Sequence, residues 1–197
     1  MKLQELIGNT PLIEYQHLDL KPGVKIYGKL EGNNPGGSVK DRAAFGMISE
    51  ALKRGDIKTG DQIVEATSGN TGIALAMIAS IMKVNMTLIM PDNATSERVK
   101  SMEAYGAKVI LTPADKTIEY SRTLADKMAK EDGYFILNQF ANPDNYKQHY
   151  KTTGPEIWRD THGKVTHFVT AMGTTGTIMG VSRYLKEQNP EIQIVGT

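Results

Sequence analysis

The sequence predicts an α/β protein with mostly parallel sheets flanked by helices. Short strand-like runs of apolar residues alternate with longer stretches of helical pattern, and the links between them are short. Strand followed by helix, repeated along a chain, is typical of a parallel sheet, because parallel strands need a crossover connection. Glycines also stand where the helices should stop, as expected for C-terminal caps, at Gly55, Gly106, Gly133 and Gly163.

The expected elements follow one another in order along the chain. The strands are short runs rich in Val, Ile and other apolar residues. They cover residues 24–30, 62–66, 86–90, 108–112, 134–138, 166–171 and 193–196. The expected helices lie between these strands. They cover residues 39–53, 71–82, 96–105, 116–131, 145–160 and 177–188.

The overall composition limits the classes of partner. Of 197 residues, 40% are hydrophobic and 23% are charged, which is ordinary for a globular protein. Lysine and arginine number 23 against 22 acidic residues, so no electrostatic argument favours nucleic acid or an anionic membrane. The chain has no cysteine, which excludes disulfides and thiolate metal sites. Its scattered histidines lack a metal-binding spacing, so we expect no metal.

The beginning of the sequence carries no sign of export. The first residues, MKLQELIGNTPLIEY, lack the apolar core and the cleavage site of a secretory signal. No apolar run in the sequence is long enough to cross a bilayer. The absence of cysteine also fits a reducing compartment. We therefore expect a cytoplasmic protein without a membrane partner.

The segment 33–42, NNPGGSVKDR, is the first to suggest chemistry. Pro35 and two glycines predict a turn, and Ser38 with Asp41 forms a capping box that predicts a helix start. Lys40 then lies in the first helical turn, where the helix dipole discourages protonation and leaves the amine more nucleophilic. A solvated lysine beside a well-capped helix is the alternative, and this segment alone favours that alternative.

The segment 66–72, ATSGNTG, lies between an expected strand and an apolar helix. Small residues there leave backbone N–H groups free to face an anion at the helix N-terminus. The side chains of Thr67, Ser68, Asn70 and Thr71 add further donors. Such a nest suits a carboxylate or a phosphate. An ordinary capped strand-to-helix turn explains this loop about as well.

The segment 173–177, GTTGT, also leads from a strand into a helix. Its glycines and threonines offer unobstructed N–H groups and hydroxyls, which suit a phosphate monoester. The dinucleotide-binding spacing Gly-x-Gly-x-x-Gly is absent. Ligands of open α/β sheets bind at the carboxyl ends of the strands, where these loops are expected. A phosphate cradle, a carboxylate cradle and a primary amine together match pyridoxal phosphate (PLP) bound to an amino acid.

The sequence resembles the cysteine synthase (O-acetylserine sulfhydrylase) family of PLP enzymes along its whole length, and the B-type members most. That family has the two-lobe PLP fold type II, the tryptophan synthase β-like fold. The matching motifs occur in the family's order. They are IGNTPL at 7–12, LEGNNPGGSVKDR around Lys40, ATSGNTG at 66–72, MPDNATSERVK at 90–100, QF and NP at 139–143, TGPEI at 153–157 and GTTGT at 173–177.

The resemblance implies a role for each matched residue. Lys40 would hold the cofactor as a Schiff base and act as catalytic base, and Asn70 would bind the ring hydroxyl. The cofactor phosphate would be held by Gly173, Thr174, Thr175, Gly176 and Thr177. The substrate α-carboxylate would be held by Thr67, Ser68, Thr71 and Gln139. No metal is implied.

The implied reaction is β-replacement in cysteine biosynthesis. O-acetylserine and sulfide would give cysteine and acetate, or thiosulfate would give S-sulfocysteine. A smaller lobe of about residues 36–141 would be inserted within a larger lobe formed by 1–35 and 142–197. Members of the family are homodimers and continue beyond residue 197. We therefore expect an incomplete catalytic domain that is poorly stable and barely active alone.

Other functions stay open. A cystathionine β-synthase has similar core motifs, and a serine or threonine dehydratase shares the fold. Dehydratases have the sequence Ser-Phe-Lys around the cofactor lysine and a nearly all-glycine phosphate loop. The segments around Lys40 and at 173–177 differ from both. A non-catalytic binding or regulatory protein would keep the fold, but it would not need a placed amine.

Overall fold

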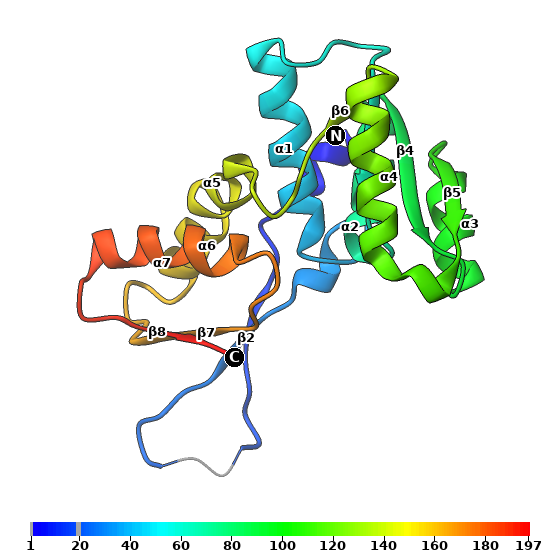
Figure 1. Cartoon of the computed structure of the whole chain (residues 1–197). Coiled ribbons are helices and arrows are strands. Elements are labelled where there is room, and N and C mark those ends of the chain that lie inside the picture. The colour runs from blue at the N-terminus through cyan, green and yellow to red at the C-terminus, as the bar shows by residue number, and fades with distance from the viewer. Residues whose placement is uncertain (1, 19–20) are drawn as a thin grey trace.

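The computed structural model describes residues 2–18 and 21–197 and confirms the α/β class (Figure 1). A parallel four-stranded sheet has the order β5-β4-β3-β6. Its strands are β3 (Gln62–Ala66), β4 (Asn85–Pro91), β5 (Lys108–Thr112) and β6 (Phe135–Ile136). The register pairs Ile63 of β3 with Met86 of β4 and with Phe135 of β6.

Helices cover both faces of this sheet. They are α1 (Lys40–Arg54), α2 (Asn70–Met82), α3 (Ser96–Ala104) and α4 (Thr117–Glu131). On one face, Ile63 and Leu88 pack in a core with residues of α1 and α2. On the other face, Val64 and Ile89 pack against Ala125 of α4. Burial on both sides explains why the central strands β3 and β4 are mostly apolar along their length rather than alternating.

The C-terminal part of the chain forms a second, smaller layered unit. Its elements are α5 (Pro143–Lys151), α6 (Thr153–Asp160), β7 (His167–Thr170), α7 (Gly176–Gln188) and β8 (Gln193–Gly196). Strands β7 and β8 pair in parallel, and Ile157, Val181 and Leu185 lie in its buried core. None of the described helices is both long and apolar enough to span a membrane.

Three expected elements differ substantially from the structure. The strand expected at 134–138 is only the two residues of β6. The strand expected at 24–30 is only β2 (Tyr27–Lys29), which pairs antiparallel with the unexpected β1 (Leu12–Glu14). The helix expected at 145–160 is two helices, α5 and α6, which meet at Thr152. A continuous helix would need an N–H group at Pro155 to bond the carbonyl of Lys151, and proline has none.

Helix ends agree with the glycine prediction, whereas the predicted capping box is wrong. Gly55 ends α1 in the left-handed region at φ 78°. At the start of α1, the Ser38 hydroxyl accepts a hydrogen bond from the Lys40 N–H at 3.2 Å. The Asp41 carboxylate does not turn back to Ser38, because it accepts a hydrogen bond from the N–H of Gly36 instead.

Helix α5 packs closely between α1 and α7 (Figure 1). A Cβ atom on Gly46 of α1 would lie 2.7 Å from Cβ of Gln148. A Cβ atom on Gly180 of α7 would lie 2.2 Å from the carbonyl oxygen of Tyr146. Only glycine permits these two close approaches, so α1 and α7 are both held against the same helix.

Candidate active site

Both predicted anion loops lie between the carboxyl end of a strand and the start of a helix. Residues 67–69 connect β3 to α2, and residues 171–175 connect β7 to α7. Lys40 is the first residue of α1. All predicted site residues except Gln139 therefore lie at or just before the N-termini of three helices, whose unpaired N–H groups favour an anion.

Lys40 is half-buried, and removal of its amine from water lowers its pKa. A lysine in that state spends more time as the neutral, nucleophilic amine. Its charge lies near enough to His149 of α5 to lower the pKa of that histidine. Within residues 2–18 and 21–197, the structure records no hydrogen bond from the Lys40 amine to either loop.

The predicted carboxylate-binding residues Thr71 and Gln139 meet, although they are far apart in the sequence. The buried Thr71 hydroxyl donates a hydrogen bond to Gln139 Oε1 at 2.9 Å. Gln139 follows Asn138, whose φ of 52° lies in the left-handed region. This bond leaves the Gln139 amide hydrogens available to donate to a ligand.

The other predicted residues of the 66–72 loop differ in exposure and in hydrogen-bond partners. Thr67 is buried and its N–H bonds the carbonyl of Ile89, while Asn70 is exposed. The carbonyl of Ser68 accepts a hydrogen bond from the Arg98 guanidinium at 3.5 Å. Thr67, Ser68 and Asn70 thus surround the start of α2, and their predicted ligand roles stay predictions.

Glu65 anchors the turn that carries Gln139, and the sequence analysis missed it. Its buried carboxylate accepts hydrogen bonds from the N–H groups of Asn138 at 2.9 Å and Gln139 at 3.2 Å. Burial raises the pKa of Glu65, and the two backbone hydrogen bonds oppose that rise. A charged residue within an apolar strand was the available signal, because buried carboxylates need partners.

Asn145, also missed in the sequence, connects Gln139 to the 173–177 loop. Its side-chain amide donates to the carbonyl of Gln139 at 2.9 Å and to the Thr174 hydroxyl at 3.0 Å. Gly176 begins α7 against this side chain, and a Cβ atom there would lie 2.0 Å from Asn145 Oδ1. Thr175 takes a left-handed φ of 62° just before the helix.

His149 lies one helical turn beyond Asn145 and faces the same loop. Nδ1 lies 2.9 Å from the Thr153 hydroxyl, and Nε2 lies 3.4 Å from the Thr177 hydroxyl. Burial, helped by the positive charge of Arg42, lowers the pKa of His149 to about 4. The sequence analysis assigned the histidines no site role, and this one is buried beside the predicted site residue Thr177.

Arg42 belongs to a buried ionic cluster beneath the first turn of α1. Its guanidinium contacts the carboxylates of Glu31 and Glu156. Burial opposes ionisation of Glu156, but hydrogen bonds from Arg42 and Lys29 outweigh it and lower its pKa to about 2. The guanidinium is occupied by these two partners and not by its sequence neighbour Asp41, whose carboxylate accepts from the N–H of Gly36.

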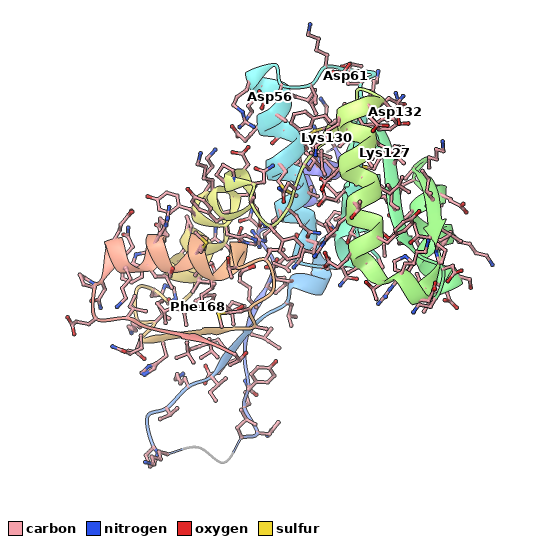
Figure 2. The ribbon with its side chains drawn as sticks, in the orientation of Figure 1. Asp56, Asp61, Lys127, Lys130, Asp132 and Phe168 are labelled. Atoms are coloured by element: carbon pink, nitrogen blue, oxygen red, sulfur yellow. The ribbon has the colours of Figure 1, made fainter. Side chains whose placement is uncertain are left out.

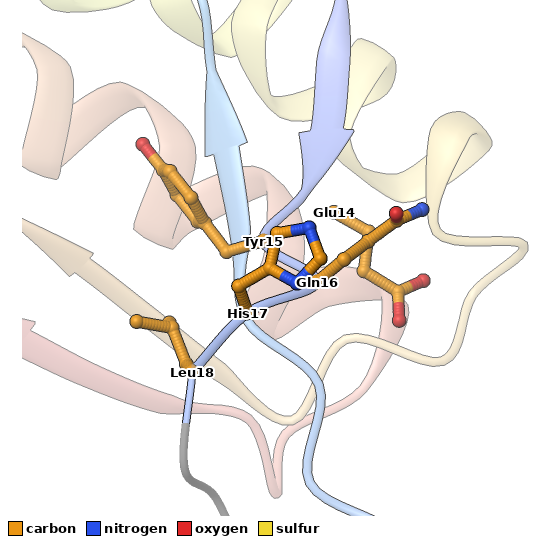
Figure 3. Close-up of a pocket in the computed structure, with 5 residues that line it drawn as sticks. All are labelled: Glu14, Tyr15, Gln16, His17 and Leu18. Atoms are coloured by element: carbon orange, nitrogen blue, oxygen red, sulfur yellow. The ribbon is translucent and has the colours of Figure 1, made fainter.

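Two surface hollows lie apart from all these residues. One of about 290 Å³ is formed by residues 14–18, directly after β1 (Figure 3). The other, of about 410 Å³, lies where residues 56–62 meet residues 133–135, near the labelled Asp56 and Asp61 (Figure 2). Neither hollow is lined by a predicted site residue. The described residues also contain no group of three or more potential metal ligands.

A family model described as pyridoxal-phosphate dependent enzyme matches residues 3–197. Cysteine synthase B of Pseudomonas aeruginosa is 58% identical over 98% of this chain and 65% of that protein. Cysteine synthase B of Escherichia coli is 56% identical over 98% of this chain and 64% of that protein. The chain therefore spans just under two thirds of the length of these relatives.

Solved structures of related proteins have the same fold. A cysteine synthase from Entamoeba histolytica has a TM-score of 0.95 at 42% identity, and the match covers 99% of this chain and 59% of that one. An O-ureido-L-serine synthase has a TM-score of 0.93 at 41% identity, with coverage of 98% and 61%. The arrangement of strands, helices and loops around Lys40 is thus shared with them.

Proposed function

Because this chain belongs to the family of pyridoxal-phosphate-dependent enzymes, we propose that the whole protein converts O-acetylserine and sulfide to cysteine and acetate. The observation that carries the proposal is the position of Gln139. It contacts the 66–72 loop through Thr71 and the 173–177 loop through Asn145. One residue therefore joins a predicted carboxylate site to a predicted phosphate site. The relatives named cysteine synthase supply the reaction.

The residues of the 173–177 loop fit the cofactor phosphate. Thr174 accepts hydrogen bonds from Asn145 and from the N–H of Gly176, which leaves its hydroxyl hydrogen to donate. A Cβ atom on Gly173 would meet no neighbouring atom, so there is open space beside this backbone. The positive end of α7 adds to the attraction for an anion. Gly173, Thr174, Thr175, Gly176 and Thr177 would hold the phosphate.

Bound pyridoxal phosphate would supply a reactive carbonyl for amines and a ring that withdraws electrons from the substrate α-carbon. Lys40 would hold the cofactor through its amine, whose lowered pKa suits that role. Once the substrate amine has replaced it, the Lys40 amine would remove the α-proton. Asn70, at the exposed start of α2, would bind the cofactor ring hydroxyl.

The substrate α-carboxylate would be bound by neutral donors. Thr71 uses its hydroxyl hydrogen on Gln139 Oε1, so the Gln139 amide and the N–H groups at the start of α2 would be the donors to the ligand. Thr67 and Ser68 would complete this site. Charge-assisted hydrogen bonds to a carboxylate are stronger than those between neutral groups. Sulfide, or thiosulfate, would then add at the β-carbon after acetate leaves.

We further propose that residues 36–141 form a smaller lobe within a larger one, and that the whole protein is a cytoplasmic homodimer. The separate four-stranded sheet of β3 to β6 supports the first proposal. Relatives described as cysteine synthases support the biosynthetic setting.

The test is a visible absorbance spectrum of the purified protein with pyridoxal phosphate, before and after addition of O-acetylserine. We expect a Lys40-dependent band that shifts with O-acetylserine, and cysteine once sulfide is added. Lys40→Ala should abolish the band. The matched control is Lys53→Ala, an exposed lysine in the last turn of the same helix, and it should keep the band. Release of pyruvate without cysteine would instead indicate a dehydratase.

A further inference from the structure

The side-chain amide of Asn145 has both of its hydrogens committed. One goes to the carbonyl oxygen of Gln139 at 2.9 Å and the other to the Thr174 hydroxyl at 3.0 Å. The side chain is 4% exposed, so water does not compete for these hydrogens. Because the Gln139 carbonyl can only accept, the amide cannot flip without turning its own oxygen toward this buried carbonyl and leaving it unpaired.

This commitment determines what the Thr174 hydroxyl can do. A hydroxyl has two lone pairs and one hydrogen. Its oxygen accepts from Asn145 at 3.0 Å and from the N–H of Gly176 at 3.5 Å. With both lone pairs in use, the hydrogen is the group left to point at a ligand. Thr174 is therefore fixed as a donor, as an anion requires.

Packing holds Asn145 in this position. Gly176 approaches it so closely that a Cβ atom there would lie 2.0 Å from Oδ1. The carbonyl that Asn145 binds belongs to Gln139, whose own N–H is held by Glu65. The Gln139 turn, Asn145 and the 173–177 loop thus form one hydrogen-bonded chain.

We propose that Asn145 is a positioning residue that orients the Thr174 hydroxyl toward the phosphate of the cofactor and couples this loop to the substrate-binding Gln139. The inference rests on the proposed function, because it needs pyridoxal phosphate as the ligand. Asn145 itself would touch neither the cofactor nor the substrate. It acts through Thr174 on one side and through the Gln139 backbone on the other.

The experiment compares the affinities of the apoprotein for pyridoxal phosphate and for pyridoxal, which lacks the phosphate. Asn145→Leu keeps the approximate shape and removes both donors. We expect pyridoxal phosphate to bind about tenfold or more weakly, as for loss of an oriented hydrogen bond to a charged group. The affinity for pyridoxal should stay unchanged, because the loss arises at the phosphate.

Variants of Thr174 separate positioning from general damage. Thr174→Val should weaken the binding of pyridoxal phosphate as much as Asn145→Leu does. The double variant should lose little further affinity, because the two changes remove the same contact to the phosphate. Thr174→Ser keeps the hydroxyl and should bind normally. Asn85→Leu is the control for loss of an amide. Asn85 donates to the carbonyl of Gly60 at the amino end of β4, whereas the predicted anion loops follow the carboxyl ends of strands.

Each outcome decides between the proposals. Equal losses for pyridoxal and pyridoxal phosphate, or fully additive losses in the double variant, would overturn the role of Asn145 and leave the proposed function intact. Failure of the unaltered protein to bind pyridoxal phosphate would overturn both. If Asn145→Leu does not fold, Asn145→Ala gives the same comparison, with the melting temperature recorded for every variant.

Discussion

The guanidinium of Arg42 and the carboxylate of Glu156 form a buried two-pronged ion pair across 114 positions of sequence. Nη1 lies 2.6 Å from Oε1 and Nη2 lies 2.7 Å from Oε2. The parallel geometry matches the planar fork of arginine to a carboxylate. The pair joins the first turn of α1, which carries Lys40, to the first turn of α6.

Loss of the Arg42 side chain should destabilise the protein strongly. Arg42→Met leaves Glu31 and Glu156 without their buried partner, which costs about 3–5 kcal/mol in comparable cases. Unfolding by urea, followed by circular dichroism, measures the change. Lys53→Met, on the same helix, removes an exposed cation whose partner Glu50 is also paired with Lys151, so it should change stability far less. Equal stability of the two variants would contradict a structural role for the cluster.

Stability should fall in mild acid because of His149. Its pKa in the folded protein is about 4, below its ordinary value of 6.5, because burial and the charges of Arg42 and Lys40 disfavour its cation more than Glu31 and Glu156 favour it. The unfolded chain therefore binds more protons between these values. The contribution of neutral His149 to the free energy of unfolding is fully present above pH 6.5. It is lost as the pH drops toward 4, by on the order of 3 kcal/mol.

The variant His149→Gln should remove most of this pH dependence. The measurement is the free energy of unfolding at several pH values between 4 and 7. His17→Gln replaces an exposed histidine and should leave the acid slope as it is. An unchanged slope in His149→Gln would show that other groups cause the loss.

Glu65→Gln should loosen the turn that holds Gln139. The carboxylate of Glu65 accepts from two backbone N–H groups, whereas a glutamine amide offers only one acceptor oxygen to them. One buried N–H should then lose its partner, at a cost of about 1–3 kcal/mol. Amide hydrogen exchange at Asn138 and Gln139 should speed up by tenfold or more, on the order of that local cost.

A matched surface change tests the specificity of that effect. Glu119→Gln replaces an exposed glutamate of α4 that pairs with Arg122. It should leave exchange at the Gln139 turn unchanged. If Glu65→Gln also leaves exchange there unchanged, the two hydrogen bonds do not hold the turn.

Local sequence was sufficient to predict the loops and most of the elements. The strands 62–66, 108–112 and 193–196 are confirmed to the residue, because short apolar runs bounded by polar links are local signals. The small residues at 66–72 and 173–177 predicted strand-to-helix loops in the same way. The break at Thr152 could have been read from Pro155 and was missed.

Long-range partnerships could not be predicted from local pattern. Glu65 bonds a turn more than seventy positions away, and Asn145 bonds Thr174 on another helix–loop segment. Nothing beside these residues in the sequence indicates such partners, since their pairing depends on how the helices pack. Arg42 likewise stood next to Asp41, the nearest acidic residue, but the fold brought Glu156 to it.

The glycine contacts of α5 have a consequence for motion. At Gly46 and Gly180, the backbones of α1 and α7 lie directly against α5, because these two residues place no side chain in the contact. Rotamer changes on the picosecond to nanosecond timescale therefore cannot alter the spacing between the helix of Lys40 and that of the 173–177 loop. The separation between the backbone of α1 and the phosphate cradle is therefore set by main-chain geometry, and only slower, concerted displacement of whole helices can change it.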